Sequence, residues 1–378
     1  MNWRKNNWRK KLRELLDGLT QKSAQGRTNC FQSLSKAFVK KYMPNFIKDR
    51  YFTICDSIER SVKKGGELEK AAAAELATIV CVQLGTDDAS EEICKTLKPV
   101  LLTTICDNSV SPTARAKCCI ALGNITFLSG GEIAEVIILM QQLEAIFSCS
   151  YLKGDGTVPN INADTANLHA SALSTWSLLF TLVTPGTISS MMKSKTLPSL
   201  EKLSELLESA HLEVRMAAGE AFVLIYELGR EESENFEEDF ALDVSETFKQ
   251  LATDSHKYRA KKDRKQQRAT FRDILQFIEN GTITDIQVKF GKEVLPLDTW
   301  TRRKQYETLC NILGPSINIH LTENDLLRDI FEITGSPADI PTYPAHQMER
   351  FRKRLLNAAN FKARTLSRAK NRDKRSDF

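Results

Sequence analysis

The sequence predicts a mainly α-helical protein, in which a solenoid of stacked helical repeats is followed by a small α+β unit and a basic carboxyl-terminal helix. Three observations predict this fold class. A motif of small and apolar residues recurs through the first two thirds of the chain, apolar residues alternate over one short stretch near residue 285, and bases gather towards the carboxyl end. We therefore assign helical repeats to residues 1–280, ending in a basic helix at 254–279, the α+β unit with a hairpin to 281–344, and a basic helix or tail to 345–378.

The recurring motif starts with a basic residue, followed at steps of three by two small residues and then directly by a large apolar one. Its four copies begin at Arg27, Arg115, His169 and Arg215. The first two are 88 residues apart, which is twice 44, and the Ala-rich segment 69–77 supplies a copy between them. The last two are 46 apart, and the middle interval is 54 because residues 153–164 add a polar loop. A period near 44 is the length of an armadillo or HEAT repeat.

A second amphipathic segment precedes each motif, so that each repeat holds at least two helices. These segments are 8–19, 46–63, 90–106, 132–147 and 197–209. Small residues let neighbouring helices approach closely, while large apolar ones fill the grooves between ridges. Ser90 and the Ser111–Pro112 pair are expected to begin helices, and glycines at 85, 130 and 229 to end them. A bundle without repeats is the alternative, but the near-constant period favours a solenoid, whose concave face usually binds a partner.

The composition changes after residue 246. Residues 254–279 are expected to form one helix, with a basic first half and a second half that carries apolar residues at helical spacing. Residues 285–290 and 293–297 flank a glycine and predict a short hairpin. Helices near 299–313 and 324–334 are expected to complete the α+β unit, and a final helix begins near 345.

Charge is segregated along the chain, although the net charge is only +5. Residues 227–246 hold nine acids and one base, whereas residues 256–272 hold eight bases and one acid, and residues 349–378 hold eleven bases and three acids. Such bases can neutralise phosphates and release counterions, so a polyanion, with RNA favoured, is the expected partner. A solvated helix face balanced by the acidic run, and a tail that only aids solubility, are the alternatives.

The predicted polyanion-binding residues come from these two basic segments. They are Lys257, Arg259, Lys261, Lys262, Arg264, Lys265, Arg268 and Arg272 in the helix, and Lys362, Arg364, Arg368, Lys370, Arg372, Lys374 and Arg375 in the tail. Lys261, Lys262, Arg264 and Lys265 also form a candidate nuclear import signal. Trp3 and Trp8 lie among bases at the amino end, and we expect them to pack on the first repeat rather than to stack on nucleic-acid bases or lie at a membrane surface.

Signals for catalysis and for other compartments are absent from the sequence. No two of the five histidines are paired at helical spacing, and there is no phosphate-binding glycine loop, nucleophile elbow or metal-ligand cluster. We expect no catalytic residue, no metal, no cofactor and no enzyme activity. The nine cysteines include no Cys-x-x-Cys pair and suit a reducing cytosol or nucleus. A bilayer-spanning helix needs about 20 consecutive apolar residues, and no stretch of the sequence is that long. No secretory signal is present either, so no membrane partner is expected.

The basic segments resemble those of the interferon-related developmental regulator family. The similar runs are HKYRAKKDRKQQRATFRDIL at 256–275 and LNAANFKARTLSRAKNRDKR at 356–375, with FGKEVL at 290–295 and DTW at 298–300 similar to the family's carboxyl-terminal domain. The resemblance extends over about residues 12–378. It implies an armadillo-like fold without catalytic activity and a role in regulating gene expression. That role is described either as transcriptional co-regulation through co-repressor complexes or as binding to non-translating ribosomes, with the carboxyl-terminal helix in the RNA channels.

The favoured hypothesis is a non-enzymatic regulator of gene expression. Its repeat scaffold would bind a ribonucleoprotein, with the non-translating ribosome as the leading candidate, through the basic segments. The alternative is a transcriptional co-regulator whose repeat surface recruits nuclear co-repressor complexes. Taken together, the two hypotheses lead us to expect a cytoplasmic and nuclear protein, and neither specifies an oligomeric state.

Overall fold

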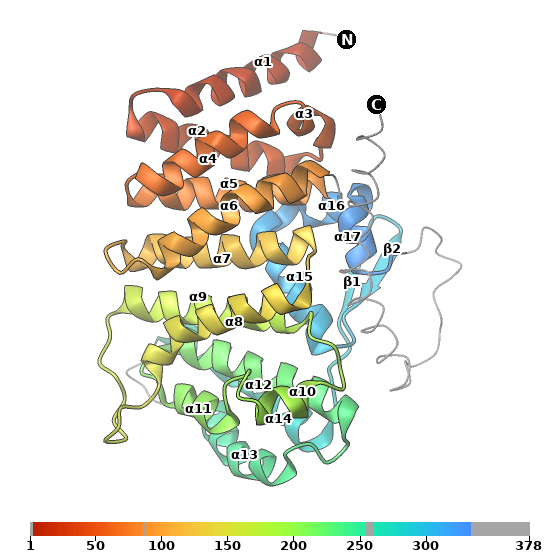
Figure 1. Ribbon diagram of the computed structural model, residues 1–378. Helices are drawn as coiled ribbons and strands as arrows, with labels where there is room; N and C mark the ends of the chain where they lie inside the picture. The colour runs from red at the N-terminus through yellow and green to blue at the C-terminus, as the bar shows by residue number, and fades with distance from the viewer. Residues whose placement is uncertain (1–2, 86–87, 255–259, 334–378) are drawn as a thin grey trace.

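The computed structural model of the protein describes residues 3–85, 88–254 and 260–333. Six helices stack side by side into one row, which we call the inner row (Figure 1). Its members are α2 (Ala24–Lys40), α5 (Glu67–Leu84), α7 (Pro112–Ser129), α9 (Ala163–Phe180), α12 (Leu212–Glu232) and α14 (Lys261–Asn280). The four motif copies and the Ala-rich segment fall on the first five of these helices, so the repeat predicted from the sequence is confirmed.

The remaining helices of the repeats pack on the inner row from one side. They are α1 (Trp3–Asp17), η1 (Gly18–Thr20), α3 (Pro44–Lys48), α4 (Tyr51–Lys64), α6 (Asp88–Cys106), α8 (Ile133–Phe147), η2 (Ser148–Ser150), α10 (Ile188–Lys193), α11 (Leu200–Glu205), η3 (Leu206–Glu208) and α13 (Glu238–Thr253). Trp8 of α1 packs beside Phe46 of α3, with 6.1 Å between ring centroids. This arrangement of paired helices is an α-solenoid, as the sequence predicts.

Small residues in the inner row are required because side chains of one helix pack directly on the backbone of the next. A Cβ added at Gly123 of α7 would lie 2.1 Å from Thr175 Cγ2 of α9, and one added at Gly219 of α12 would lie 2.7 Å from Ile274 Cδ1 of α14. Large side chains such as Trp176 and Phe180, which stack at 5.1 Å, fill the space beside these contacts. The alternation of small and large residues therefore explains both the close approach and the packed core.

The first residue of each motif copy bonds to a neighbouring helix or turn, a role that the sequence pattern did not reveal. Arg27 donates to Glu69 at 2.7 Å, Arg115 to the Ile105 carbonyl at 2.9 Å and Arg215 to Gln267 Oε1 at 2.7 Å, and His169 Nδ1 lies 2.6 Å from Ser150 Oγ. All four are buried or partly buried contacts between different repeats or between the helices of one repeat. The motif thus supplies polar side-chain contacts between helices as well as small contact residues.

Several expected helix ends differ from those in the structure. Ser111 caps α7 through its side chain, as expected, but Ser90 lies inside α6, which begins at Asp88. Gly229 does not end α12, which continues to Glu232. The missing side chain of Gly229 instead leaves room for the Phe236 ring, which packs against the helix.

The predicted helix at 254–279 is shorter at its start than expected. α13 ends at Thr253 and α14 begins at Lys261, where Ala260 has an extended ψ of 140°. The buried Gln267 side chain donates to the Leu251 carbonyl and to Asp254, so α14 is folded back against α13. The helix ends as expected before Gly281, whose φ of 65° only glycine adopts readily.

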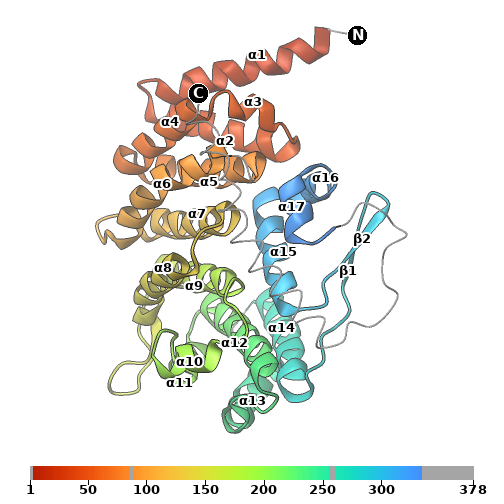
Figure 2. The same ribbon diagram turned by 45° about the vertical axis from the view of Figure 1, so that its right-hand side comes forward.

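After α14 the chain returns along the inner row. Strands β1 (Gln287–Phe290) and β2 (Glu293–Pro296) form the predicted antiparallel hairpin, in which Phe290 pairs with Glu293. The helices α15 (Trp300–Leu313), α16 (Ile317–Glu323) and α17 (Asp325–Ile330), with η4 (Gly314–Ser316), follow; we call α15–α17 the return segment. α15 contacts α2, α5, α9 and α12, so it crosses most of the array (Figure 2).

One stretch of the described residues, Ile133–Ser150, is long and apolar enough by composition to cross a membrane. In the structure its helix α8 is the outer helix of a repeat. Its side chains Val136, Leu139 and Leu143 are buried against the rest of the array. All nine cysteines are free, and burial raises the pKa of the Cys55 and Cys118 thiols to about 12, which suits a packing role.

Candidate functional site

The basic helix α14 is held in place by one apolar face. Phe271, Ile274, Phe277 and Ile278 are buried against α12 and α13. Gln267 extends this anchored face, because its Oε1 accepts from both Nε and Nη2 of the buried Arg215. The helix is therefore a fixed part of the last repeat.

The opposite face of α14 carries a row of bases, which we call the basic row. Lys261, Lys265, Arg268 and Arg272 follow one another at steps of four, three and four, so they lie on one side of the helix. Lys261, Lys265 and Arg272 are exposed and Arg268 is partly exposed. At 1.5 Å per residue the row is about 17 Å long. None of the four forms an ion pair with another residue that the structure describes.

The other predicted site residues are distributed as follows. Lys262 is exposed beside the basic row, and Arg264 is partly buried. Lys257 and Arg259 lie outside the described residues. So do the predicted tail residues Lys362, Arg364, Arg368, Lys370, Arg372, Lys374 and Arg375.

Acids of the run 227–246 are used elsewhere in the fold. Glu227 is buried, and its two carboxylate oxygens accept from the backbone N–H groups of Trp300 and Thr301 at 2.8 and 2.9 Å. It thus caps the amino end of α15, where a negative charge also suits the helix dipole. Glu232 accepts from the Ser189 N–H at 3.1 Å. No sequence pattern predicts this cap, because 73 residues separate Glu227 from Trp300.

The return segment is joined to the inner row by polar contacts along its length. Lys304 Nζ lies 2.6 Å from Glu220 and 2.7 Å from Ser174 Oγ, and Gln305 donates to Thr181 at 3.1 Å. At the far end, His320 Nε2 lies 2.9 Å from the Val39 carbonyl and Asn324 donates to the Val82 carbonyl at 2.8 Å. These contacts connect the carboxyl-terminal part of the fold to both the first and the last repeats.

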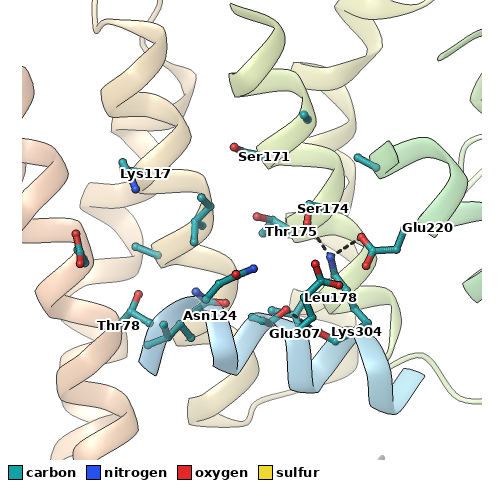
Figure 3. A pocket seen from close by; sticks show the side chains of 18 of the residues that line it. Thr78, Lys117, Asn124, Ser171, Ser174, Thr175, Leu178, Glu220, Lys304 and Glu307 are labelled. Carbon is teal, nitrogen blue, oxygen red and sulfur yellow. Dashed lines mark hydrogen bonds and ion pairs between the residues drawn. The ribbon is translucent and has the colours of Figure 1, made fainter. Parts of the chain in front are cut away.

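A cleft remains between α15 and the inner row (Figure 3). Its volume is about 390 Å³, and its walls come from α5, α7, α9, α12 and α15. Asn124 of α7 lies in it, as do Lys304 and Glu307 of α15. Surrounding protein atoms and the nearby carboxylate of Glu220 raise the pKa of Glu307 above its usual range. The sequence does not predict this cleft, because it forms only when the chain after α14 packs back along the inner row.

No group of three or more His, Cys, Asp or Glu side chains in the described ranges is placed to hold a metal ion. Two surfaces that the described residues offer for binding are the basic row and the cleft. Both suit non-covalent recognition: the row offers positive charge to an extended partner, and the cleft offers carboxylates and an amide to a small group.

The fold and these surfaces define a helical-repeat scaffold whose inner face is partly covered by its own carboxyl-terminal segment. The chain belongs to the interferon-related developmental regulator family, which it matches over residues 2–279, and residues 324–376 match the interferon-related protein conserved region. The resemblance stated from the two basic motifs is thereby confirmed. The second match includes α17 and the predicted basic tail.

Known relatives cover nearly the whole chain. It is 39% identical to mouse interferon-related developmental regulator 2 over 98% of this chain and 84% of that protein. It is 40% identical to pig interferon-related developmental regulator 1 over 97% of this chain and 81% of that protein. Among solved structures, a designed armadillo repeat protein is similar at 14% identity over 70% of this chain and 99% of that chain, with a TM-score of 0.42.

Proposed function

We propose that the protein is a non-enzymatic regulator of gene expression that docks on a ribonucleoprotein through α14, with the ribosome as the leading candidate. The observation that carries this proposal is the basic row: four bases on one face of an anchored helix, without an ion-pair partner among the described residues. The family membership supports the regulatory role. RNA would be recognised by its backbone and shape, because the described basic row contains no aromatic side chain for stacking on bases.

The basic row makes a quantitative prediction about salt. Each phosphate that a base neutralises adds about −0.7 to −0.9 to the slope of log K against log salt concentration. Four contacts would therefore contribute a slope of about −3. The predicted tail would add its own contribution and order on contact with RNA.

The test is co-sedimentation with purified ribosomes at several salt concentrations. The test variant replaces Lys261, Lys265, Arg268 and Arg272 with Gln, which preserves the buried face of α14. A matched control replaces four exposed lysines elsewhere, Lys36, Lys64, Lys153 and Lys193, with Gln. We expect weaker binding and a slope smaller by about 3 in the test variant only. A truncation after Asn360 measures the tail's share.

Equal binding by the parent and the test variant would contradict the proposal, as would an equal loss in the control. The alternative role, recruitment of nuclear co-repressor complexes by the repeat surface, predicts a different pattern. Capture of such complexes from nuclear extract would then be unchanged in the test variant. The import signal at Lys261, Lys262, Arg264 and Lys265 predicts instead that the nuclear fraction falls when these residues are replaced.

A further inference from the structure

The cleft between α15 and the inner row has the size of a binding site. Its volume of about 390 Å³ lies within the range of about 300–1,000 Å³ that is usual for pockets that hold small groups. Five helices from both ends of the chain line it, so its walls are fixed by the packing of the whole array. Apolar residues Ile79, Ile120 and Ile312 form part of these walls.

The unneutralised charge in the cleft is negative. Lys304 is already bonded to Glu220 and Ser174 (Figure 3). The other charged residues in the lining are Glu75, Glu213, Glu307 and Lys117, three acids against one base. All four residues reach solvent, although surrounding protein atoms partly desolvate the Glu307 carboxylate, and none forms an ion pair within the part of the chain that the structure describes. A phosphate would meet these carboxylates unfavourably, whereas an ammonium or guanidinium group would be attracted.

An amide in the cleft lacks a hydrogen-bond partner. Asn124 is 3% exposed, and its Nδ2 has no acceptor among the residues that the structure describes. A buried donor without an acceptor costs free energy, and an acceptor supplied by a ligand in the cleft would remove that cost. The repeat itself does not require Asn here. Nine residues after the start of the motif, the other copies have Lys36, Leu178 and Leu224.

We propose that the cleft binds a short extended segment of a partner polypeptide that carries a lysine or arginine. A backbone carbonyl of this segment accepts from Asn124 Nδ2. The basic side chain lies near the carboxylate of Glu307, and its aliphatic stem contacts the isoleucines. A free polyamine would satisfy the carboxylates but offers no acceptor to Asn124, so the amide favours a polypeptide. This site is separate from the basic row and holds whether or not α14 binds RNA.

The proposal is tested with the full chain and blocked pentapeptides in which four alanines surround one central residue. Titration calorimetry or ligand-observed NMR measures binding of probes with a central Arg, Lys, Leu or Glu, and of spermidine. We expect saturable binding of the Arg and Lys probes, and binding of the Glu probe weaker by about tenfold or more. A tenfold difference corresponds to about 1.4 kcal/mol, which opposed ionic contacts of this kind readily supply.

Two variants separate the contributions of the site. Asn124→Leu introduces a residue that other repeats carry at this position, and we expect it to weaken binding of the Arg and Leu probes alike, by about 3- to 10-fold. Glu307→Gln should weaken the Arg and Lys probes and leave the Leu probe unchanged. Glu234→Gln, at an exposed position outside the cleft, is the matched charge control and should change nothing.

Four outcomes would overturn the proposal. The first is that the Arg and Lys probes show no saturable binding up to about 5 mM, a concentration that corresponds to roughly −3 kcal/mol. The second is that the Glu probe binds as tightly as the Arg and Lys probes, and the third is that spermidine binds as tightly as the peptides. The fourth is that Asn124→Leu binds the peptides as tightly as the parent chain. A fourth variant replaces Lys362, Arg364, Arg368, Lys370, Arg372, Lys374 and Arg375 with Gln. Tighter peptide binding by that variant would make the chain's own tail the occupant and overturn the assignment to a partner. Ribosome binding by Asn124→Leu should equal that of the parent chain, so this test and that of the basic row fail independently.

Discussion

His169 is a single residue whose burial couples folding to pH. It is 5% exposed, its Nδ1 lies 2.6 Å from Ser150 Oγ, and burial together with the nearby Arg115 lowers its pKa from 6.5 to about 4. Below pH 6.5 the His169 imidazole is protonated in the unfolded chain but stays neutral in the folded chain. The free energy of unfolding therefore falls as the pH drops from 6.5 towards 4. We expect His169 alone to lower the free energy of unfolding by about 2 kcal/mol between pH 7 and pH 5.

Urea denaturation at both pH values checks this expectation. His169→Gln should be less stable than the parent at pH 7, because the buried site is disturbed, but should lose about 2 kcal/mol less on acidification. A parallel loss in the parent and the variant would show that other groups cause the pH dependence.

Glu227 is the residue on which the return of the chain depends most directly. Its buried carboxylate accepts from two backbone N–H groups and from Thr301 Oγ1. Glu227→Ala leaves these donors without a partner, and we expect it to cost about 2–4 kcal/mol of unfolding free energy. Hydrogen exchange at residues 300–304 should speed up most. Exchange that rises equally throughout α12 and α15 would contradict a local capping role.

At the scale of single helices, α14 depends on close contact with α12. A Cβ at Gly219 would lie 2.7 Å from Ile274 Cδ1 and 2.9 Å from Phe271 Cε1, which are two anchors of α14. Gly219→Ala should therefore destabilise the fold by about 1–3 kcal/mol despite the better helix propensity of alanine. Denaturant unfolding measures the loss, and Gly154→Ala, in open space on a loop, is the control. A stabilised Gly219→Ala chain would show that α14 can shift without cost.

The helices that sequence reasoning could predict are those whose signals are local. The motif copies at Arg27, Arg115, His169 and Arg215 predicted α2, α7, α9 and α12 of the inner row, because small residues at a near-constant period reflect contacts between adjacent repeats. The basic row followed from composition in the same way. The helix α14 begins later than predicted, because Ala260 has an extended backbone conformation directly before Lys261.

The cleft and the return segment could not be predicted, since they depend on contacts between distant residues. Lys304 bonds to Ser174, which is 130 residues away, and His320 to Val39, which is 281 residues away. No periodicity encodes such pairs. Asn124 could have been noticed as an amide where two other copies carry Leu, but only the structure shows that it lies in a cleft.

For the molecule as a whole, the return segment changes how the array should unfold. In an open solenoid each repeat contacts only its neighbours, so distant repeats can unfold separately. Here Asn324 donates to Val82 in α5 and also caps α17 through its Oδ1. Asn324→Ala should cost about 2–3 kcal/mol and lower the denaturant m-value, because the first repeats lose their link to the last ones.

Urea unfolding followed by both circular dichroism and tryptophan fluorescence measures this effect. Thr322→Ala, which removes a hydrogen bond within α16 only, is the control. Coincident transitions and an unchanged m-value in Asn324→Ala would mean that the array is cooperative without the link.

α15 also limits how this scaffold can change during evolution. An open array of repeats can gain or lose a unit by duplication or deletion, because each junction resembles the next. In this chain the distance from the Glu227 cap to the Val39 and Val82 carbonyls must match a return segment of fixed length. Inserting one repeat would separate His320 and Asn324 from their acceptors at the same time as it displaced Lys304 from Glu220. The number of repeats is therefore constrained, and length variation should be confined to loops such as 153–164 and to the ends of the chain.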